Sequence, residues 1–141
     1  MAFYLPIILT ALATTVYHVA QKSVAPGANP LVSLVMSYLT ALGVSLGALL
    51  ASTGGRALAA SVHKLNWASY VVGVSIFGVE LAVLLAYRAG WRISLASVVA
   101  NVATALLLVV VGLLFYREHL AAKHVLGVGL CLAGLVLVAQ R

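Results

Sequence analysis

The chain has 141 residues, of which 65% are hydrophobic and 7% charged, with eight Lys or Arg residues against two acidic ones and a formal net charge of +6. A soluble domain of this size could not cover so apolar a core with so few charges, so the composition excludes a soluble protein and predicts an integral membrane protein. The basic residues are scattered rather than clustered, which argues against a nucleic-acid partner and favours the head groups of the lipid bilayer.

Five apolar segments follow one another along the chain, at about 3–20, 31–52, 67–87, 93–115 and 121–139. Each has about the 17–25 residues that a helix needs to cross hydrocarbon, whereas a β-barrel would need alternating segments about half as long. The sequence therefore predicts an all-α membrane protein, in which residues 1–141 form a single domain of five transmembrane helices.

The first segment (3–20) carries polar residues along one face of the predicted helix. These residues are Thr10, Thr14, Tyr17, His18 and Gln21. A signal peptide is the alternative for this segment, but no Lys or Arg precedes it and its apolar run is long for such a peptide. For His18, near the end of the segment, a side chain that reaches for the membrane surface and a proton relay both stay open.

The connections between the segments are short and contain residues that end or begin helices. Residues 21–30 hold Pro26, Gly27 and Pro30, which predict the end of one helix and the start of the next. Between the third and fourth segments, Gly90 can adopt a positive φ angle in a tight turn. The second and fifth segments carry ridges of small residues, which predict close helix packing.

Glu80 lies near the middle of the third segment (67–87) and is one of only two acidic residues in the chain. A carboxylate at membrane depth costs about 2.5–3.5 kcal/mol on insertion scales, so such a group faces a bundle interior or a wet cavity. Burial favours the neutral acid and a cationic ligand favours the carboxylate, so a group balanced between the two can exchange a proton for a cation. The alternative is a neutral acid, hydrogen-bonded inside the bundle and without a function.

The fourth segment (93–115) carries a second polar stripe, and two tyrosines flank the predicted cavity. The stripe consists of Ser94, Ser97, Asn101 and Thr104. For its hydroxyl groups the alternative role is hydrogen bonding between helices, worth on average about 0.6 kcal/mol. Asn101 demands more partners because its amide both donates and accepts. We expect Tyr17, Tyr87 and Asn101 to line a substrate cavity near Glu80.

The positive charges divide evenly between the two sides that five spans would create. With the N-terminus inside, four lie on the inner side (Arg56, Lys64, Arg117 and Lys123) and four on the outer side (Lys22, Arg88, Arg92 and Arg141). This balance is typical of a protein that inserts both ways and pairs antiparallel, and also of a small protein with a weak orientation bias. An inverted pair of five-helix units would reproduce the inverted repeats of secondary transporters, and a heteromeric partner is the alternative.

Several kinds of catalytic or metal site are missing from the sequence. No two carboxylates share a segment, no Cys/His cluster has the spacing of metal ligands, and no Gly-rich phosphate loop is present. No third group that would orient a catalytic triad can be named. The sequence therefore predicts a protein that is not an enzyme and uses neither a metal nor a cofactor.

Four stretches carry a family resemblance: 85–90 (LAYRAG), 94–99 (SLASVV), 112–120 (GLLFYREHL) and 127–138 (GVGLCLAGLVLV). From about 77 to 140 the chain resembles the EamA-type half of the drug/metabolite transporter superfamily, in which Glu118 matches the conserved acid after the fourth span. Most such proteins resemble two fused five-helix repeats in inverted orientation, so the resemblance implies that this single repeat forms a dimer. The chain departs from the pattern at Asn101, where many members have a proline and the bend that it makes.

These features predict a transporter subunit in a prokaryotic inner membrane, acting as an antiparallel homodimer. It would move a small metabolite or organic cation by alternating access, with Glu80 as the proton or cation site. One alternative is a subunit of a lipid-linked sugar flippase. The other is a non-transporting accessory protein of the membrane, in which Glu80 fixes a partner helix.

Overall fold

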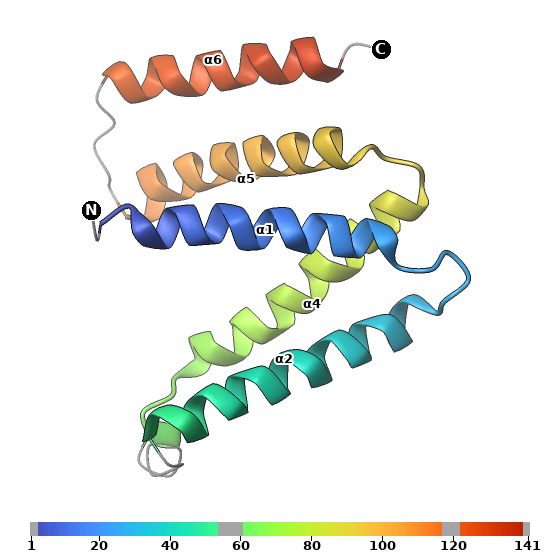
Figure 1. The fold of residues 1–141 in the computed structure, drawn as a ribbon. Helices are drawn as coiled ribbons and strands as arrows, with labels where there is room; N and C mark the ends of the chain where they lie inside the picture. Colours follow the sequence, from blue (N-terminus) through green and yellow to red (C-terminus); the bar gives the residue numbers. More distant parts are fainter. Residues whose placement is uncertain (1–2, 54–60, 117–121, 140–141) are drawn as a thin grey trace. The chain divides into compact units, whose positions relative to one another are not determined.

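The computed structural model describes residues 3–53, 61–116 and 122–139 (Figure 1). These residues form five long α-helices: α1 (Leu5–Ser23), α2 (Pro30–Thr53), α4 (Trp67–Arg88), α5 (Ile93–Phe115) and α6 (Ala122–Ala139). The prediction of an all-α protein is confirmed, and every helix begins and ends within three residues of the predicted segment. Glu118, which the family resemblance places at a helix end, lies outside the described residues.

Three of the helices are long and apolar enough to cross a membrane. They are Pro30–Ser52, Trp67–Arg88 and Ile93–Phe115, with hydropathies of 1.9, 2.0 and 2.7. These three helices mark the chain as an integral membrane protein. Five such helices were expected, and three are found among the described residues. The polar stripe of α1 lowers the hydropathy of that helix.

Local signals explain where the helices begin and end. The Asn29 side chain accepts a hydrogen bond from the Leu31 amide at 2.9 Å, and Pro30, which needs no such bond, opens α2. Asn66 caps α4 in the same way, accepting from the Ala68 amide at 3.1 Å. Gly90 has a φ angle of 93°, which only glycine adopts without strain, so the chain turns out of α4 as expected.

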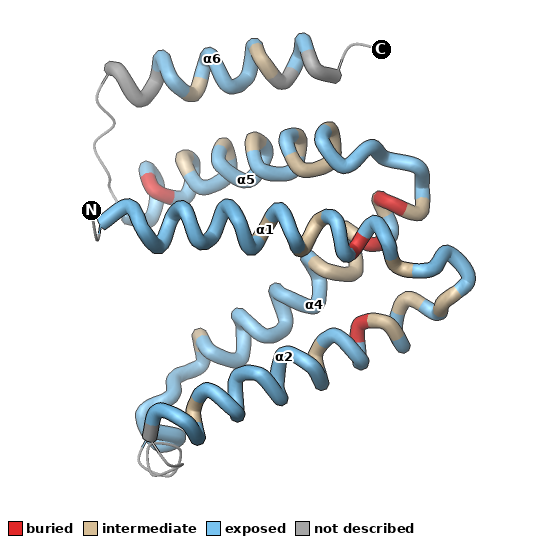
Figure 2. The backbone as a smooth tube through the Cα atoms, in the orientation of Figure 1, coloured by how far each residue is buried: buried red, intermediate tan, exposed pale blue. Residues whose placement is uncertain are grey.

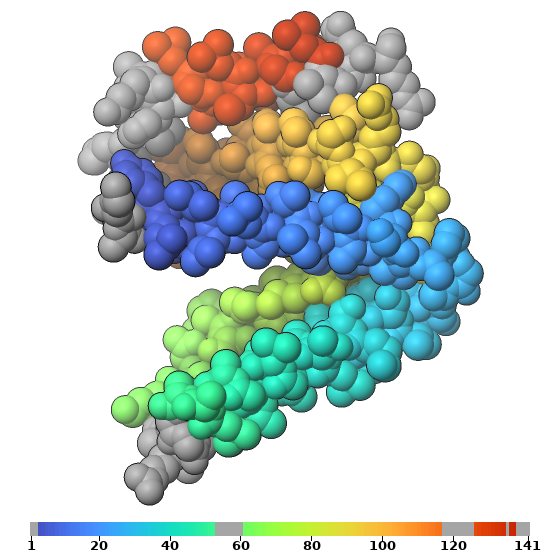
Figure 3. All heavy atoms as spheres, viewed as in Figure 1, coloured from blue at the N-terminus to red at the C-terminus, as the bar shows by residue number. Residues whose placement is uncertain are grey.

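The described chain packs as two compact units. One comprises Met1–Val19 and Gly90–Arg141, and in it α5 packs against α6 (Figures 1 and 3). The other is Ala20–Ala89, in which α2 and α4 pack as an antiparallel pair. That the whole chain forms a single domain stays a prediction.

Burial is concentrated in the Ala20–Ala89 unit. Leu34, Leu84 and Tyr87 form its apolar core, and the Gln21 side chain is buried beside them (Figure 2). Elsewhere large apolar side chains are exposed, so that only 6% of each candidate span is buried within the chain. Such surfaces are stable only against lipid or another apolar protein surface.

Candidate functional site

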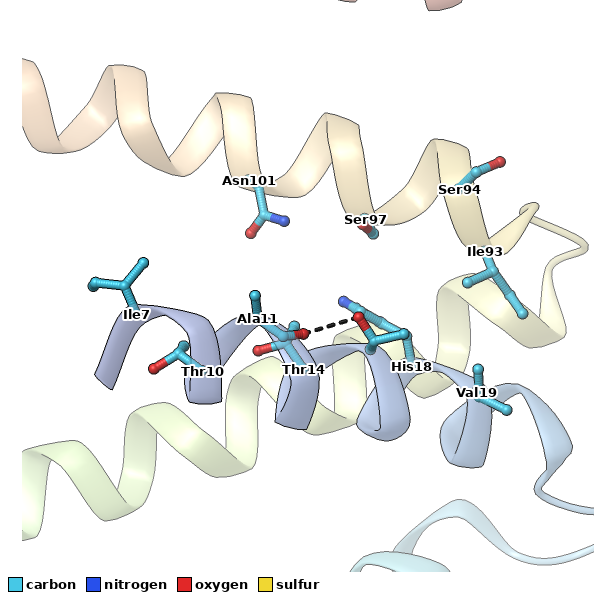
Figure 4. A pocket seen from close by; sticks show the side chains of 11 residues that line it. Ile7, Thr10, Ala11, Thr14, His18, Val19, Ile93, Ser94, Ser97 and Asn101 are labelled. Carbon is cyan, nitrogen blue, oxygen red and sulfur yellow. Dashed lines mark hydrogen bonds between the residues drawn. The ribbon is translucent and has the colours of Figure 1, made fainter. Parts of the chain in front are cut away.

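A groove of about 490 Å³ lies between α1 and α5 in the first unit (Figure 4). Its lining combines the two polar stripes of the sequence with a few apolar side chains. The lining residues are Ile7, Thr10, Ala11, Thr14, Thr15, His18 and Val19 from α1, and Ile93, Ser94, Ser97 and Asn101 from α5. Its volume lies within the range of about 300–1,000 Å³ that is typical of small-molecule sites.

Two of the three threonines of α1 direct their hydroxyl protons to their own helix. Thr10 Oγ1 donates to the Pro6 carbonyl and Thr15 Oγ1 to the Ala11 carbonyl, both at 2.8 Å. A hydroxyl whose proton is committed in this way still has acceptor lone pairs to offer. The α1 wall of the groove is therefore rich in hydrogen-bond acceptors, which suits a ligand with N–H donors or a positive charge.

The α5 wall adds the one side-chain amide of the groove. Asn101 extends from α5 toward α1, while His18 extends from α1 into the space between the two helices (Figure 4). The amide supplies both a donor and an acceptor, and so can orient a polar ligand. No Asp, Glu, Lys or Arg belongs to this lining, in which His18 supplies the imidazole group.

Tyr17 was expected to line the cavity but lies outside the lining of the groove. Its ring packs edge-on against His18, with the ring centroids 5.2 Å apart and the planes at 65°. Tyr17 therefore contacts a lining residue and is in a position to orient its imidazole. Thr104, the last member of the α5 stripe, also lies outside the lining.

Glu80 lies in the Ala20–Ala89 unit, on α4, and is half-buried. The Tyr38 hydroxyl of α2 is close enough to feel the charge of this carboxyl, but no hydrogen bond joins the two groups in the structure. That hydroxyl is buried and has no hydrogen-bond partner among the described residues. The lone acid of the hairpin and a buried, unpartnered phenol thus belong to the two helices that pack together.

Sequence reasoning missed Tyr38, although a signal for it exists. Tyr38 follows the first residue of α2 by eight positions, and Glu80 precedes the last residue of α4 by eight positions. In an antiparallel hairpin these positions lie at the same depth, about 12 Å from the shared end at 1.5 Å per residue. Counting from the two ends of the hairpin would have paired the two side chains.

Tyr87, the last predicted site residue, is buried at the end of the hairpin, with 5% of its surface exposed. Lys22 Nζ donates to the Tyr87 carbonyl at 3.3 Å and lies 5.4 Å from the centroid of the Tyr87 ring. A cation at that distance from an aromatic face is attracted by it. Tyr87 therefore holds the end of α1 to the end of α4.

The predicted site residues are thus divided between the two units, with Tyr17 and Asn101 in one and Glu80 and Tyr87 in the other. The described residues contain no group of three or more His, Cys, Asp or Glu side chains that could hold a metal ion. No family model, curated protein or solved structure matches the sequence. The functional argument consequently rests on the chemistry of the groove and of the hairpin.

Proposed function

We propose that this chain is a membrane transporter subunit that moves a small metabolite or organic cation by alternating access. The observation that carries the proposal is the polar groove between α1 and α5. An apolar helix such as α5 gains nothing from a stripe of hydroxyl and amide groups facing lipid, so the stripe needs a polar ligand or water. The acceptor-rich α1 wall favours a ligand that donates hydrogen bonds or carries positive charge.

Glu80 couples transport to the proton gradient in this proposal. A carboxyl group in a membrane helix is a candidate proton site by default, and the Tyr38 hydroxyl offers it a partner across the hairpin. The phenol can donate to the carboxylate and accept from the carboxylic acid, so it serves both protonation states. The pair therefore provides a reversible proton store at one depth of the hairpin.

The proposed assembly is an antiparallel homodimer in a prokaryotic inner membrane. The even division of positive charges gives no preferred orientation, and the resemblance to EamA-type transporters implies a second, inverted repeat. The small share of each candidate span that is buried within the chain leaves apolar surface for that partner. These observations support the dimer together.

Flux through reconstituted vesicles tests the transport proposal. Proteoliposomes would be loaded in parallel with a small primary ammonium ion, a neutral polyol and a small carboxylate, under an imposed pH gradient. We expect flux of the ammonium ion, reduced about fivefold or more in Asn101→Leu through loss of amide hydrogen bonds. Thr104→Val is the matched control, because Thr104 lies on the same stripe of α5 but outside the groove.

Two results would contradict the proposal. One is the absence of flux for all three solutes in vesicles that contain folded protein. The other is equal flux in Asn101→Leu and the wild type, which would remove the groove from the transport path.

Reporters of topology test the assembly. A C-terminal fusion to a protein active only in the cytoplasm, and another to one active only outside, should both give signal if the chain inserts in both orientations. Signal from one side alone would exclude the antiparallel homodimer and require an oppositely oriented partner chain.

A further inference from the structure

A second cavity, of about 300 Å³, lies in the Ala20–Ala89 unit where α1 ends, α2 begins and α4 ends. Cationic, amide and apolar side chains line it. The lining residues are Gln21, Lys22, Val24, Pro26, Leu84, Tyr87 and Arg88. Glu80, the acid of the hairpin, is not among them, so the cavity is distinct from the proposed proton site.

The charge in this cavity is positive. Lys22 and Arg88 each contribute a full charge, and the lining contains no carboxylate. The ends of α1 and α4 oppose this with about half a negative charge each, from their C-terminal carbonyl groups. The sum is about one positive charge, so the cavity favours an anion even after the two side chains have neutralised the helix ends.

The donors of the cavity are held in place by the backbone around them. One terminal nitrogen of Arg88 donates to the Ala28 carbonyl at 2.5 Å and approaches the Ala25 carbonyl at 3.4 Å, which fixes the guanidinium plane. Arg88 Nε is buried and has no hydrogen-bond partner among the described residues. A buried donor without a partner costs about 1–3 kcal/mol, more for a charged group.

The position of the cavity in the membrane identifies the anion. Arg88 is the last residue of the candidate span Trp67–Arg88, so the cavity lies at the level where a span leaves the hydrocarbon. Lipid phosphates lie at that level, with the acyl chains below them. The apolar Val24, Pro26 and Leu84 complete a lining that matches an anionic head group with the start of its chains.

We propose that this cavity binds the phosphate group of an anionic phospholipid between Lys22 and Arg88. The assignment is independent of the transport proposal, because it uses neither the groove nor Glu80. A bound phosphate bridges the end of α1 and the end of α4, and so locks the α2/α4 hairpin to the segment that precedes it. A free phosphate would satisfy the same donors, and the experiment separates the two sources.

Native mass spectrometry of the full chain in detergent tests the proposal. The protein would be mixed with equal amounts of phosphatidylglycerol and phosphatidylcholine, with helical content checked by circular dichroism. We expect the wild type to retain phosphatidylglycerol about tenfold better. Lys22→Gln should lose that preference, because it removes the charge while an amide can still donate to the Tyr87 carbonyl. Arg92→Gln, which removes an arginine four positions further along the chain and outside the lining, should keep it.

Further arms keep the proposal falsifiable. Val24→Phe fills the cavity without altering charge and should also abolish the preference for phosphatidylglycerol. The site can therefore still be tested if Lys22→Gln fails to fold.

The response to inorganic phosphate separates a lipid from a soluble ligand. If inorganic phosphate raises the melting temperature of the wild type but not of Lys22→Gln, and neither lipid is preferred, the site binds a soluble phosphate. Equal retention of both lipids with no response to phosphate would overturn the site. Equal loss of preference in Arg92→Gln would also overturn it, because general surface charge would then explain the binding.

Discussion

The groove between α1 and α5 and the α2/α4 hairpin differ in the partners of their polar side chains. The hydroxyl protons of Thr10 and Thr15 in the groove bond to carbonyls of their own helix, and no permanently charged side chain lines it. In the hairpin unit, charged groups reach across segments far apart in the sequence, as Arg88 does toward Ala25 and Ala28. Neutral hydrogen-bond acceptors suit a site through which a ligand passes. Charged side chains with fixed partners suit segments that stay packed together, and a carboxyl group among them can bind and release a proton.

Glu80→Gln should have the largest effect and tests whether the hairpin handles the proton. The substitution keeps the size and hydrogen bonding of the side chain but removes its ability to release a proton, so uptake driven by a pH gradient should fall to background while the protein still folds. Proteoliposome flux with and without the gradient measures the effect. Ser75→Ala on the same helix is the control, since the exposed Ser75 hydroxyl bonds only to the Val71 carbonyl of its own helix. Unchanged gradient-driven uptake in Glu80→Gln would remove the coupling role.

Arg88→Ala tests whether charge serves as framework in the hairpin. The variant loses the hydrogen bonds to the Ala25 and Ala28 carbonyls. Hydrogen bonds to charged groups contribute about 1.5–3 kcal/mol, so the stability in detergent should fall by about that amount. Thermal unfolding followed by circular dichroism checks it. An equal loss in Arg92→Ala would show that interfacial charge in general, rather than this clamp, stabilises the chain.

Tyr38→Phe separates proton handling from stability within the hairpin. Because the Tyr38 hydroxyl has no hydrogen-bond partner among the described residues, its removal should leave the melting temperature unchanged or slightly raised. Gradient-driven uptake should fall about five- to tenfold, because the hydrogen bond that the phenol is proposed to make to Glu80 during transport is worth about 1 kcal/mol. Tyr70→Phe, at an exposed tyrosine of α4, is the control. A lower melting temperature with normal uptake would make Tyr38 structural.

Thr15→Val should have the smallest effect and sharpens the description of the groove. The substitution removes one acceptor from the α1 wall while keeping the shape of the side chain. A single such contact is worth about 0.6 kcal/mol, so the KM for uptake should rise by less than about threefold. Thr40→Val is the matched control, because the Thr40 hydroxyl makes the same kind of bond, to the Met36 carbonyl, on α2. An equal change in both variants would show that the effect comes from the helix rather than from the groove.

Sequence alone predicted the helices well because their signals are local. Apolar length, the Asn29–Pro30 start and the left-handed Gly90 turn are each decided within a few residues. The polar stripes were also visible, but the sequence could not show which two would line one groove. Five spans were expected, and three of the described helices meet the requirement. For α1 the prediction relied on length, while the polar face of the helix lowers its hydropathy.

The contacts between distant segments were beyond local reasoning. Arg88 and Lys22 were counted as interfacial charges for orientation, whereas the structure gives each a backbone carbonyl partner at least 60 positions away. Tyr38 was overlooked because, from sequence alone, a tyrosine in an apolar span is expected only to pack against other side chains. Its neighbour across the hairpin is known only from the structure. Asn101 was singled out for the demands of its amide, and it lines the groove.

The equal depth of Tyr38 and Glu80 limits how the hairpin can move. If α4 advanced by one residue along α2 in a screw motion, Glu80 would shift by about 1.5 Å and swing about 100° around the helix axis, away from the phenol. Sliding would therefore break the pair at its first step. A conformational cycle that keeps the pair together has to move α2 and α4 as one rigid body.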